Sequence, residues 1–135
     1  MNYQINASSI SNQDAEIQIK ESTIAFGTTS KTAETLPNPA ELLLGSFSAC
    51  MLKNVERFSS LMRFTYSKAK LEVKATRLEN PPRMDNIEYN LTIYSKDQKL
   101  NTALLRKNLE KFGTIYNTLK LSCSISGTVN KSENV

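Results

Sequence analysis

The chain has 135 residues, 39% of them hydrophobic, and this length favours a single domain over residues 1–135 with a core of its own. The 17 Lys and Arg residues outnumber the 13 Asp and Glu residues, but a net charge of +4 does not by itself indicate a nucleic-acid partner. The chain contains no His, which excludes Ser-His-Asp and Cys-His nucleophiles and imidazole metal ligands.

The first elements in chain order are three short segments that alternate apolar and polar residues, as strands with one buried face do. They are Tyr3–Ala7, Ala15–Ile19 and Ile24–Phe26. The polar segment Thr28–Thr35 follows them and is expected to form a loop. The N-terminal part of the chain is therefore predicted to consist of strands and a loop.

A long helix is predicted from Asn38 to about Arg63. Asn38 suits the N-cap, Pro39 the first helical position, and Glu41 the third, where its carboxylate closes a capping box. The first half of this helix, residues 42–52, is apolar or small on nearly every face. That composition predicts a helix that is buried on all sides.

A helix buried on all sides is hard to cover in so small a domain, because a sheet covers only one side of it. A second copy of the chain would cover the other side through an extensive apolar homodimer interface. A second helix packed over the first within one chain would do the same. The burial argument favours the homodimer, and the intrachain alternative stays open.

The remaining elements complete the predicted fold. Two clearly alternating segments, Ala69–Ala75 and Ile87–Ile93, predict strands. A second helix is predicted over Gln98–Phe112, with Gly113 as a left-handed C-cap, and a last strand over Leu119–Ile125. This order predicts an α+β fold in which a mainly antiparallel six-stranded sheet covers a long buried central helix and a second helix.

Cys50, in the middle of the long helix, is the first candidate for chemistry. Without His, only a cation, a helix N-terminus or hydrogen bonds could stabilise its thiolate, and the N-terminus is about three turns away. Lys53 is the only nearby cation in the sequence. On spacing alone, a small buried hydrophobic residue is the favoured interpretation of Cys50, and a reactive thiol is the alternative.

The other candidate residues have structural explanations as well. Cys123 is expected at an inward strand position, and the sequence leaves open whether it can form a disulfide with Cys50. Glu41 could orient a cation or act as a catalytic acid, but helix capping explains it at least as well. Tyr116 and Asn117 could contribute polar groups to a cleft or simply form a turn.

The cysteine count and the absence of long apolar segments bear on location. With two Cys, the chain cannot build a four-cysteine zinc site, and we expect both to be reduced thiols. No segment approaches about 18 consecutive apolar residues, and the N-terminus lacks the pattern of a signal peptide. These features predict a cytoplasmic protein without a membrane partner.

Two segments carry a resemblance to a known family. The segment Asn38–Cys50, which reads NPAELLLGSFSAC, resembles the motif of the OsmC/Ohr family, the osmotically inducible and organic hydroperoxide resistance proteins. In that motif Pro, Glu, a Leu run and small residues lead to a helical cysteine. The segment Gly113–Leu119 looks like the family's second motif, where a Cys-Pro-Val-Ser-like stretch precedes Asn-Thr-Leu. The order of elements agrees along almost the whole chain.

The resemblance implies an intertwined homodimer with two active sites at the subunit interface. It implies that Cys50 is the peroxidatic thiol, which attacks an organic hydroperoxide and becomes a sulfenic acid. A second cysteine of the family then resolves this sulfenic acid as a disulfide. The implied activity is peroxiredoxin-like, serves the response to oxidative stress, and requires no metal and no organic cofactor.

This chain departs from the family pattern in the residues that carry the chemistry. The resolving cysteine would fall at position 113, where the chain has Gly113. The family's peroxidases use an N-terminal Arg to activate the thiol, and here no Arg precedes Arg57. The carboxylate that partners that Arg would fall at Ala40, whereas Glu41 matches a neighbouring motif position.

Two hypotheses of function follow. In the first, the chain is an OsmC-like thiol protein in which Cys50 reduces organic hydroperoxides and an external thiol acts as resolver. In the second, it is a catalytically inactive dimer that binds a small apolar ligand at the subunit interface. Nucleic-acid binding rests only on an isoelectric point of about 9.1 and is not favoured.

Overall fold

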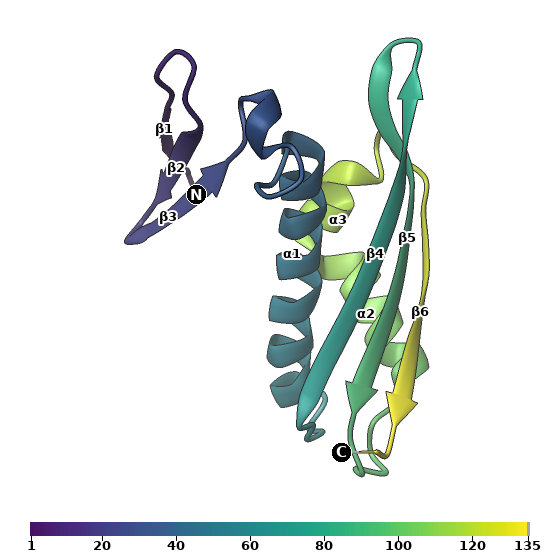
Figure 1. Ribbon diagram of the computed structural model, residues 1–135. Helices are drawn as coiled ribbons and strands as arrows, with labels where there is room; N and C mark the ends of the chain where they lie inside the picture. Colours follow the sequence, from purple (N-terminus) through teal and green to yellow (C-terminus); the bar gives the residue numbers. More distant parts are fainter. Residues whose placement is uncertain (135) are drawn as a thin grey trace. The chain divides into compact units, whose positions relative to one another are not determined.

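The computed structural model describes residues 1–134, which form two compact units, residues 1–43 and residues 44–134. Helix α1 (Pro39–Leu61) begins in the first unit and continues through the second. Figure 1 shows the elements in chain order. That residues 1–135 form a single domain stays a prediction.

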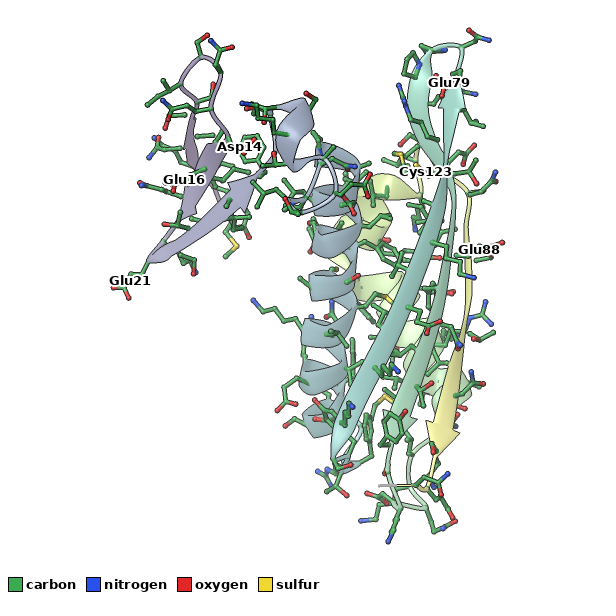
Figure 2. The ribbon with its side chains drawn as sticks, in the orientation of Figure 1. Asp14, Glu16, Glu21, Glu79, Glu88 and Cys123 are labelled. Carbon is green, nitrogen blue, oxygen red and sulfur yellow. The ribbon has the colours of Figure 1, made fainter. Side chains whose placement is uncertain are left out.

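The first unit is an antiparallel sheet of β1 (Asn6–Ser8), β2 (Ala15–Ile19) and β3 (Ser22–Phe26), in that order, followed by the short 3-10 helix η1 (Ser30–Thr32). The second and third predicted strands are confirmed, whereas the first begins at Asn6 rather than Tyr3 and has no buried face, since all its residues are exposed. Asp14, labelled in Figure 2, ties the loop to the sheet because its carboxylate accepts hydrogen bonds from the backbone N–H groups and hydroxyls of nearby threonines.

The start of α1 confirms the predicted capping box. The backbone N–H of Glu41 donates to Asn38 Oδ1 at 2.9 Å, and the backbone N–H of Asn38 donates to Glu41 Oε1 at 3.1 Å. Pro39 occupies the first helical position, where no intrahelical donor is needed. These contacts are local in sequence, which is why the residues alone could predict them.

Burial along α1 is one-sided in the single chain. Phe47, Met51 and Val55 are fully buried, whereas Ala49 and Leu52 on another face are exposed. The all-round burial that the sequence suggested is therefore not met by one chain. The face of Ala49 and Leu52 is left for solvent or for a further chain.

The second unit contains a sheet of β4 (Lys68–Glu79), β5 (Pro82–Tyr94) and β6 (Ile125–Ser132). β4 pairs antiparallel with β5, whereas β6 pairs parallel with β5, from Ile87 opposite Ile125 onward. The predicted strand number and mainly antiparallel pairing are confirmed. The six strands form two three-stranded sheets rather than one, because β3 and β4 are not paired in the described chain.

Helices α1, α2 (Thr102–Phe112) and α3 (Thr114–Leu119) lie on one face of this sheet (Figure 1). The core between helices and sheet is apolar, and its fully buried members include Phe47, Val55, Leu91, Ile93, Leu105 and Leu109. Alternate residues of β5, such as Glu88 and Asn90, point to the other face and are exposed. The sheet therefore has one buried and one polar face.

Three predictions about the C-terminal part are wrong. Gly113 has a φ of −72°, so it ends α2 in an extended rather than a left-handed conformation. Leu119 lies in a helix, α3, and Leu121 is 86% exposed. Cys123 lies in the bend before β6, which begins only at Ile125. The alternating apolar residues suggested a strand here, but Tyr116 is buried on α3 and the chain folds into a short helix around it.

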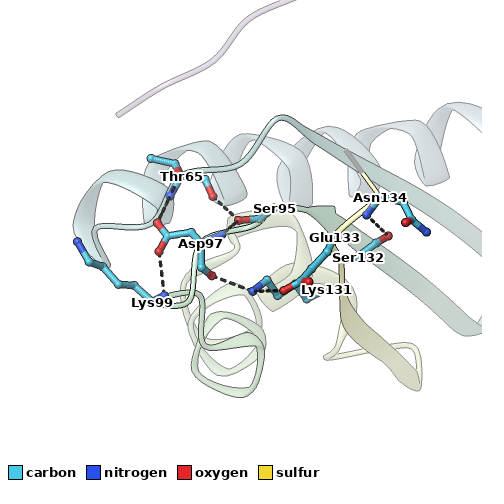
Figure 3. Close-up of polar contacts among 8 residues, drawn as sticks. All are labelled: Thr65, Ser95, Asp97, Lys99, Lys131, Ser132, Glu133 and Asn134. Atoms are coloured by element: carbon cyan, nitrogen blue, oxygen red, sulfur yellow. Dashed lines mark hydrogen bonds and ion pairs between the residues drawn. The ribbon is translucent and has the colours of Figure 1, made fainter.

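A polar network closes the end of the second unit, where α1, β5 and β6 meet the connecting loops (Figure 3). The carboxylate of Asp97 accepts hydrogen bonds from the backbone N–H groups of Lys99 at 2.8 Å and Thr65 at 2.9 Å. Lys131 Nζ donates to the backbone carbonyl of Asp97 at 2.9 Å, and the buried Ser95 hydroxyl donates to Thr65 O at 2.6 Å. Asp97 thus links three segments that are distant in the sequence.

Candidate functional site

Cys50 lies on α1 with a half-buried, free thiol. The junction between α2 and α3 packs directly on it, because a Cβ atom placed on Gly113 would lie 3.4 Å from Cys50 Sγ. In a disulfide each Cβ lies about 3 Å from the partner's sulfur, given an S–S bond of about 2.05 Å. Position 113 is therefore where a cysteine that forms a disulfide with Cys50 would stand, and in this chain it is glycine.

Gly113 is also tightly packed. A Cβ there would lie 2.9 Å from the backbone oxygen of Leu109 and 3.0 Å from Tyr116 Cβ. Both distances are shorter than ordinary van der Waals contacts, so any side chain requires a small shift of the junction. Glycine therefore relieves crowding within the α2–α3 junction, whereas the distance to Cys50 Sγ on α1 is an ordinary van der Waals contact.

The immediate neighbours of Cys50 are neutral. Asn54, one turn further along α1, donates from Nδ2 to Cys50 O at 2.9 Å and lies 3.7 Å from Cys50 Sγ. Among residues 1–134 this amide is the only group that hydrogen-bonds Cys50 Sγ. Lys53, the cation expected from the sequence, is exposed, and the Arg57 guanidinium lies over the Phe58 ring instead.

A group of buried aromatic rings lies one helical turn before Cys50. The Phe47 ring, one turn before the thiol, lies 6.1 Å from the ring centroids of both Tyr89 and Tyr116. Tyr89 is 3% exposed, and its hydroxyl donates to Glu110 Oε1 at 2.8 Å. Burial raises the pKa of Tyr89 well above its usual value, and the hydrogen bond to Glu110 adds to the shift. The network fixes α2, and with it Gly113, against β5.

Sequence reasoning treated Tyr89 only as an inward apolar position and did not foresee its partner. A signal was present, since a buried Tyr usually has a hydrogen-bond partner. Arg106 and Glu110 are also spaced for a pair on one helix, and Arg106 Nε donates to Glu110 Oε1 at 3.0 Å. What the sequence could not supply is that α2 faces β5 at this point.

The other predicted candidates lie apart from these contacts or serve the fold. The Cys123 thiol is free and donates to the backbone oxygen of Met84 at 3.3 Å. Glu41 is engaged in the capping box, and its weaker candidacy as a catalytic acid stays a prediction. Asn117 donates from Nδ2 to Lys111 O at 3.0 Å. Tyr116 and Asn117 thus belong to a helix rather than to a turn.

Comparison with known families decides the relationship. The OsmC-like protein family matches residues 31–132, which include Cys50 and Gly113. The chain belongs to the OsmC-like protein family. Among curated proteins, none matches the sequence of this OsmC-like chain.

Solved structures confirm the OsmC-like fold. An OsmC-like protein from Mycoplasma pneumoniae is 19% identical and superimposes with a TM-score of 0.87 over 98% of this chain and 99% of that chain. An organic hydroperoxide resistance protein from Elizabethkingia anophelis is 13% identical, with a TM-score of 0.68 over 99% of both chains. The organic hydroperoxide resistance protein OhrB of Bacillus subtilis is 12% identical, with a TM-score of 0.63 over 96% and 98%.

Two further observations concern partners of other kinds. None of the helices within residues 1–134 is both long and apolar enough to cross a membrane. The same residues contain no cluster of three Cys, Asp or Glu side chains placed to hold a metal ion. The candidate site of this OsmC-like chain is the Cys50 thiol together with the α2–α3 junction that contacts it.

Proposed function

We propose that this OsmC-like chain reduces organic hydroperoxides through Cys50, with an external thiol as resolver. The Cys50 thiolate attacks one peroxide oxygen, the O–O bond breaks, and the alcohol leaves with a proton from solvent. Cys50 becomes a sulfenic acid. An external thiol condenses with it to form a mixed disulfide and water, and a second thiol releases Cys50 and a disulfide product.

One observation carries the proposal: the free Cys50 thiol lies against position 113, and that position is glycine. A sulfenic acid on Cys50 therefore has no cysteine beside it at the junction. The two hydroperoxide resistance proteins that share the fold support hydroperoxides as the substrate class. A role in the oxidative stress response and a cytoplasmic location belong to the same proposal, and no metal or organic cofactor is needed for it.

A homodimer is part of the proposed function. The exposed face of α1 carries the apolar residues Ala49 and Leu52, and a second copy of the chain would cover them. Light scattering tests this directly against the chain mass of 15.1 kDa. We expect twice that mass, and a stable monomer would refute the dimer.

The chemistry is tested with Cys123→Ser, which leaves Cys50 as the single thiol. We expect cumene hydroperoxide to produce a sulfenic acid on Cys50 that a dimedone-type reagent traps, detected by mass spectrometry. We also expect iodoacetamide to alkylate Cys50 at neutral pH. Cys50→Ser in the same background is the control. If no sulfenic acid forms and alkylation is negligible, the proposed activity is refuted.

A second candidate function is an inactive OsmC-like dimer that binds a small apolar ligand at its interface. The hydrogen-bond partner of Cys50 Sγ is the neutral Asn54 amide, which favours this candidate because an activated thiol usually has a cation nearby. A fluorescent apolar probe bound equally by Cys50→Ser, together with no sulfenic acid in the chain with Cys50, would favour this candidate over the peroxidase.

A further inference from the structure

The Asn54 amide lies beside two atoms of Cys50. Asn54 Nδ2 is 2.9 Å from the Cys50 backbone oxygen and 3.7 Å from Cys50 Sγ. A backbone oxygen only accepts hydrogen bonds, so the group beside it is the amino group of the amide rather than Oδ1. That amino group carries two hydrogens. One serves the backbone oxygen, and the other is available to the sulfur.

The contact with the sulfur goes beyond what the helix requires. A polar side chain within a helix often bonds the carbonyl four residues earlier, and the contact of Asn54 with Cys50 O is of this kind. A single donor is enough for it, because the Ser48 hydroxyl on the same helix donates to Leu44 O at 2.8 Å. Asn54 has a second donor, and Cys50 Sγ is the acceptor within its reach.

The charged and titratable groups around the sulfur have other partners. Lys53 and Arg57 on α1 are exposed. Within three residues of Gly113, the α2–α3 junction carries three such groups, namely Glu110, Lys111 and Tyr116. Glu110 accepts hydrogen bonds from β5 and from α2, and Lys111 Nζ lies over the Phe112 ring at 5.2 Å. Burial raises the pKa of Tyr116, so its hydroxyl stays uncharged at neutral pH. Within residues 1–134, none of these groups hydrogen-bonds Cys50 Sγ.

We infer that the Asn54 N–H stabilises the Cys50 thiolate and so raises the fraction of the thiol that can attack a hydroperoxide. This inference rests on the proposed function. A hydrogen bond to the charged form of a group favours that form, and here an uncharged amide supplies the bond. During the attack the sulfur bonds one peroxide oxygen and the O–O bond breaks. Asn54 keeps its hydrogens throughout, and solvent supplies the proton that leaves with the alcohol.

The test follows the alkylation of Cys50 by iodoacetamide against pH in the Cys123→Ser chain, which is the parent for all variants. The midpoint of the rate profile measures how readily the thiolate forms. Asn54→Ala removes the donor, and its midpoint should rise by about half a pH unit, with rates about threefold lower below the midpoint. Asn54→Asp replaces the donor with a carboxylate, and the like charge should raise the midpoint further.

The rate at high pH separates a donor to the sulfur from a merely structural contact. A thiolate that has lost a hydrogen bond is more basic, and nucleophilicity rises with basicity. Asn54→Ala should therefore react more slowly than the parent below the midpoint, but at an equal or up to about twofold higher rate on the high-pH plateau. A loosened helix would instead raise the rate at every pH and leave the midpoint where it is, and that result would overturn the inference.

Asn108 offers a matched control on α2. Its Nδ2 also lies beside a sulfur, Met62 Sδ at 3.5 Å, but it makes no hydrogen bond to Cys50. Asn108→Ala removes the same amide by the same substitution, and it should leave the midpoint of Cys50 alkylation unchanged. An equal shift in Asn108→Ala and Asn54→Ala would show that the shift does not come from the contact with Cys50 Sγ.

Reaction with hydroperoxide provides the second readout. At pH 7, cumene hydroperoxide should produce Cys50 sulfenic acid about threefold more slowly in Asn54→Ala than in the parent, and at the parent rate in Asn108→Ala. If sulfenic acid forms equally fast in all three and the midpoint does not move, Asn54 does not stabilise the thiolate and the proposed function stands. If no sulfenic acid forms in the parent, the proposed function fails, and the role of Asn54 in the attack fails with it.

Discussion

The two cysteines of this chain occupy very different regions, although both are half-buried and free. Cys123 lies in the bend before β6, and its thiol proton is used in a hydrogen bond to Met84 O at 3.3 Å. Cys50 lies on a long helix, where its sulfur faces an Asn54 amide donor and the backbone of Gly113. The Cys123 thiol donates a hydrogen bond to a carbonyl, whereas the Cys50 sulfur lies beside an amide donor.

This difference teaches that burial alone does not separate a structural thiol from a candidate site. Cys123 packs against the core and fills a hydrogen bond of the loop, which is the usual role of a free cysteine. Cys50 lies at a junction where a Cβ can hardly be accommodated. Gly113 relieves the crowding at this junction, and it leaves Cys50 without a cysteine at the position that contacts its sulfur.

The largest expected effect comes from removing each thiol in turn. Cys50→Ser should lower the rate of cumene hydroperoxide reduction by at least about 1000-fold, because the nucleophile itself is lost. Cys123→Ser should change that rate by less than about twofold, since its sulfur serves only the bend. Peroxide consumption measured with an excess of 2-mercaptoethanol checks both. A large loss in Cys123→Ser would contradict the separation of the two thiols.

The next effect comes from restoring a cysteine at the junction. Gly113→Cys should form a disulfide with Cys50 after one equivalent of hydroperoxide, because the Cβ at position 113 stands 3.4 Å from Cys50 Sγ. The tight contact with Leu109 O should lower the free energy of unfolding of the reduced variant by about 1–3 kcal/mol. Peptide mapping without reductant identifies the linked cysteines.

Gly113→Ser is the matched control for that experiment, since it adds a side chain of similar size that cannot form a disulfide. It should show a similar loss of stability and no cross-link. A Gly113→Cys chain in which both thiols remain free after oxidation would show that the junction cannot adopt the geometry of a disulfide. A disulfide between Cys50 and Cys123 instead would overturn the comparison on which these predictions rest.

How much the sequence could predict depended on how local each feature is. The capping box of Asn38 and Glu41 and the extent of α1 follow from residues within a few positions of each other. The parallel pairing of β6 with β5 does not, because alternation shows which residues share a face but not the direction of the neighbouring strand. Helix α3 escaped prediction because it is six residues long and depends on tertiary burial of Tyr116.

The candidate site was predictable only in part for the same reason. Cys50 and position 113 could be paired through a family resemblance, and their contact is confirmed by the distance between them. The link from Tyr89 to Glu110 depends on how α2 lies on β5, which no pattern within either segment encodes.

A smaller effect should come from Tyr89→Phe, which tests whether the support beneath Cys50 is specific to that thiol. Loss of the hydrogen bond to Glu110 should lower the free energy of unfolding by about 1 kcal/mol. Because burial and Glu110 raise the pKa of Tyr89 in the folded chain, its contribution is fully present below about pH 10 and is lost as the pH rises above that value.

Urea unfolding between pH 8 and pH 11 measures this dependence. The stability of the chain with Tyr89 should fall more steeply over that range than the stability of Tyr89→Phe. The rate of Cys50 alkylation should change in Tyr89→Phe, because α2 and Gly113 are held less firmly. The rate of Cys123 alkylation should stay the same. Equal changes at both thiols would show a general loosening of the fold instead.

The smallest effect is expected from Asp97→Asn. Asp97 lies in the polar network that closes one end of the second unit, and its hydrogen bonds involve neither thiol. Hydrogen bonds from the backbone N–H groups of Lys99 and Thr65 hold the pKa of Asp97 below its usual value. The charged carboxylate therefore stabilises the fold above about pH 4, and this contribution is lost as the pH falls through the lowered pKa. Asp97→Asn should lower Tm at neutral pH, and the difference in Tm between the variant and the unmodified chain should narrow as the pH falls below about 4. Thermal unfolding followed by circular dichroism across this pH range checks the direction of the change in Tm. An unchanged ratio of Cys50 to Cys123 alkylation rates in the same variant would confirm that the Asp97 network stabilises the fold without affecting the candidate site.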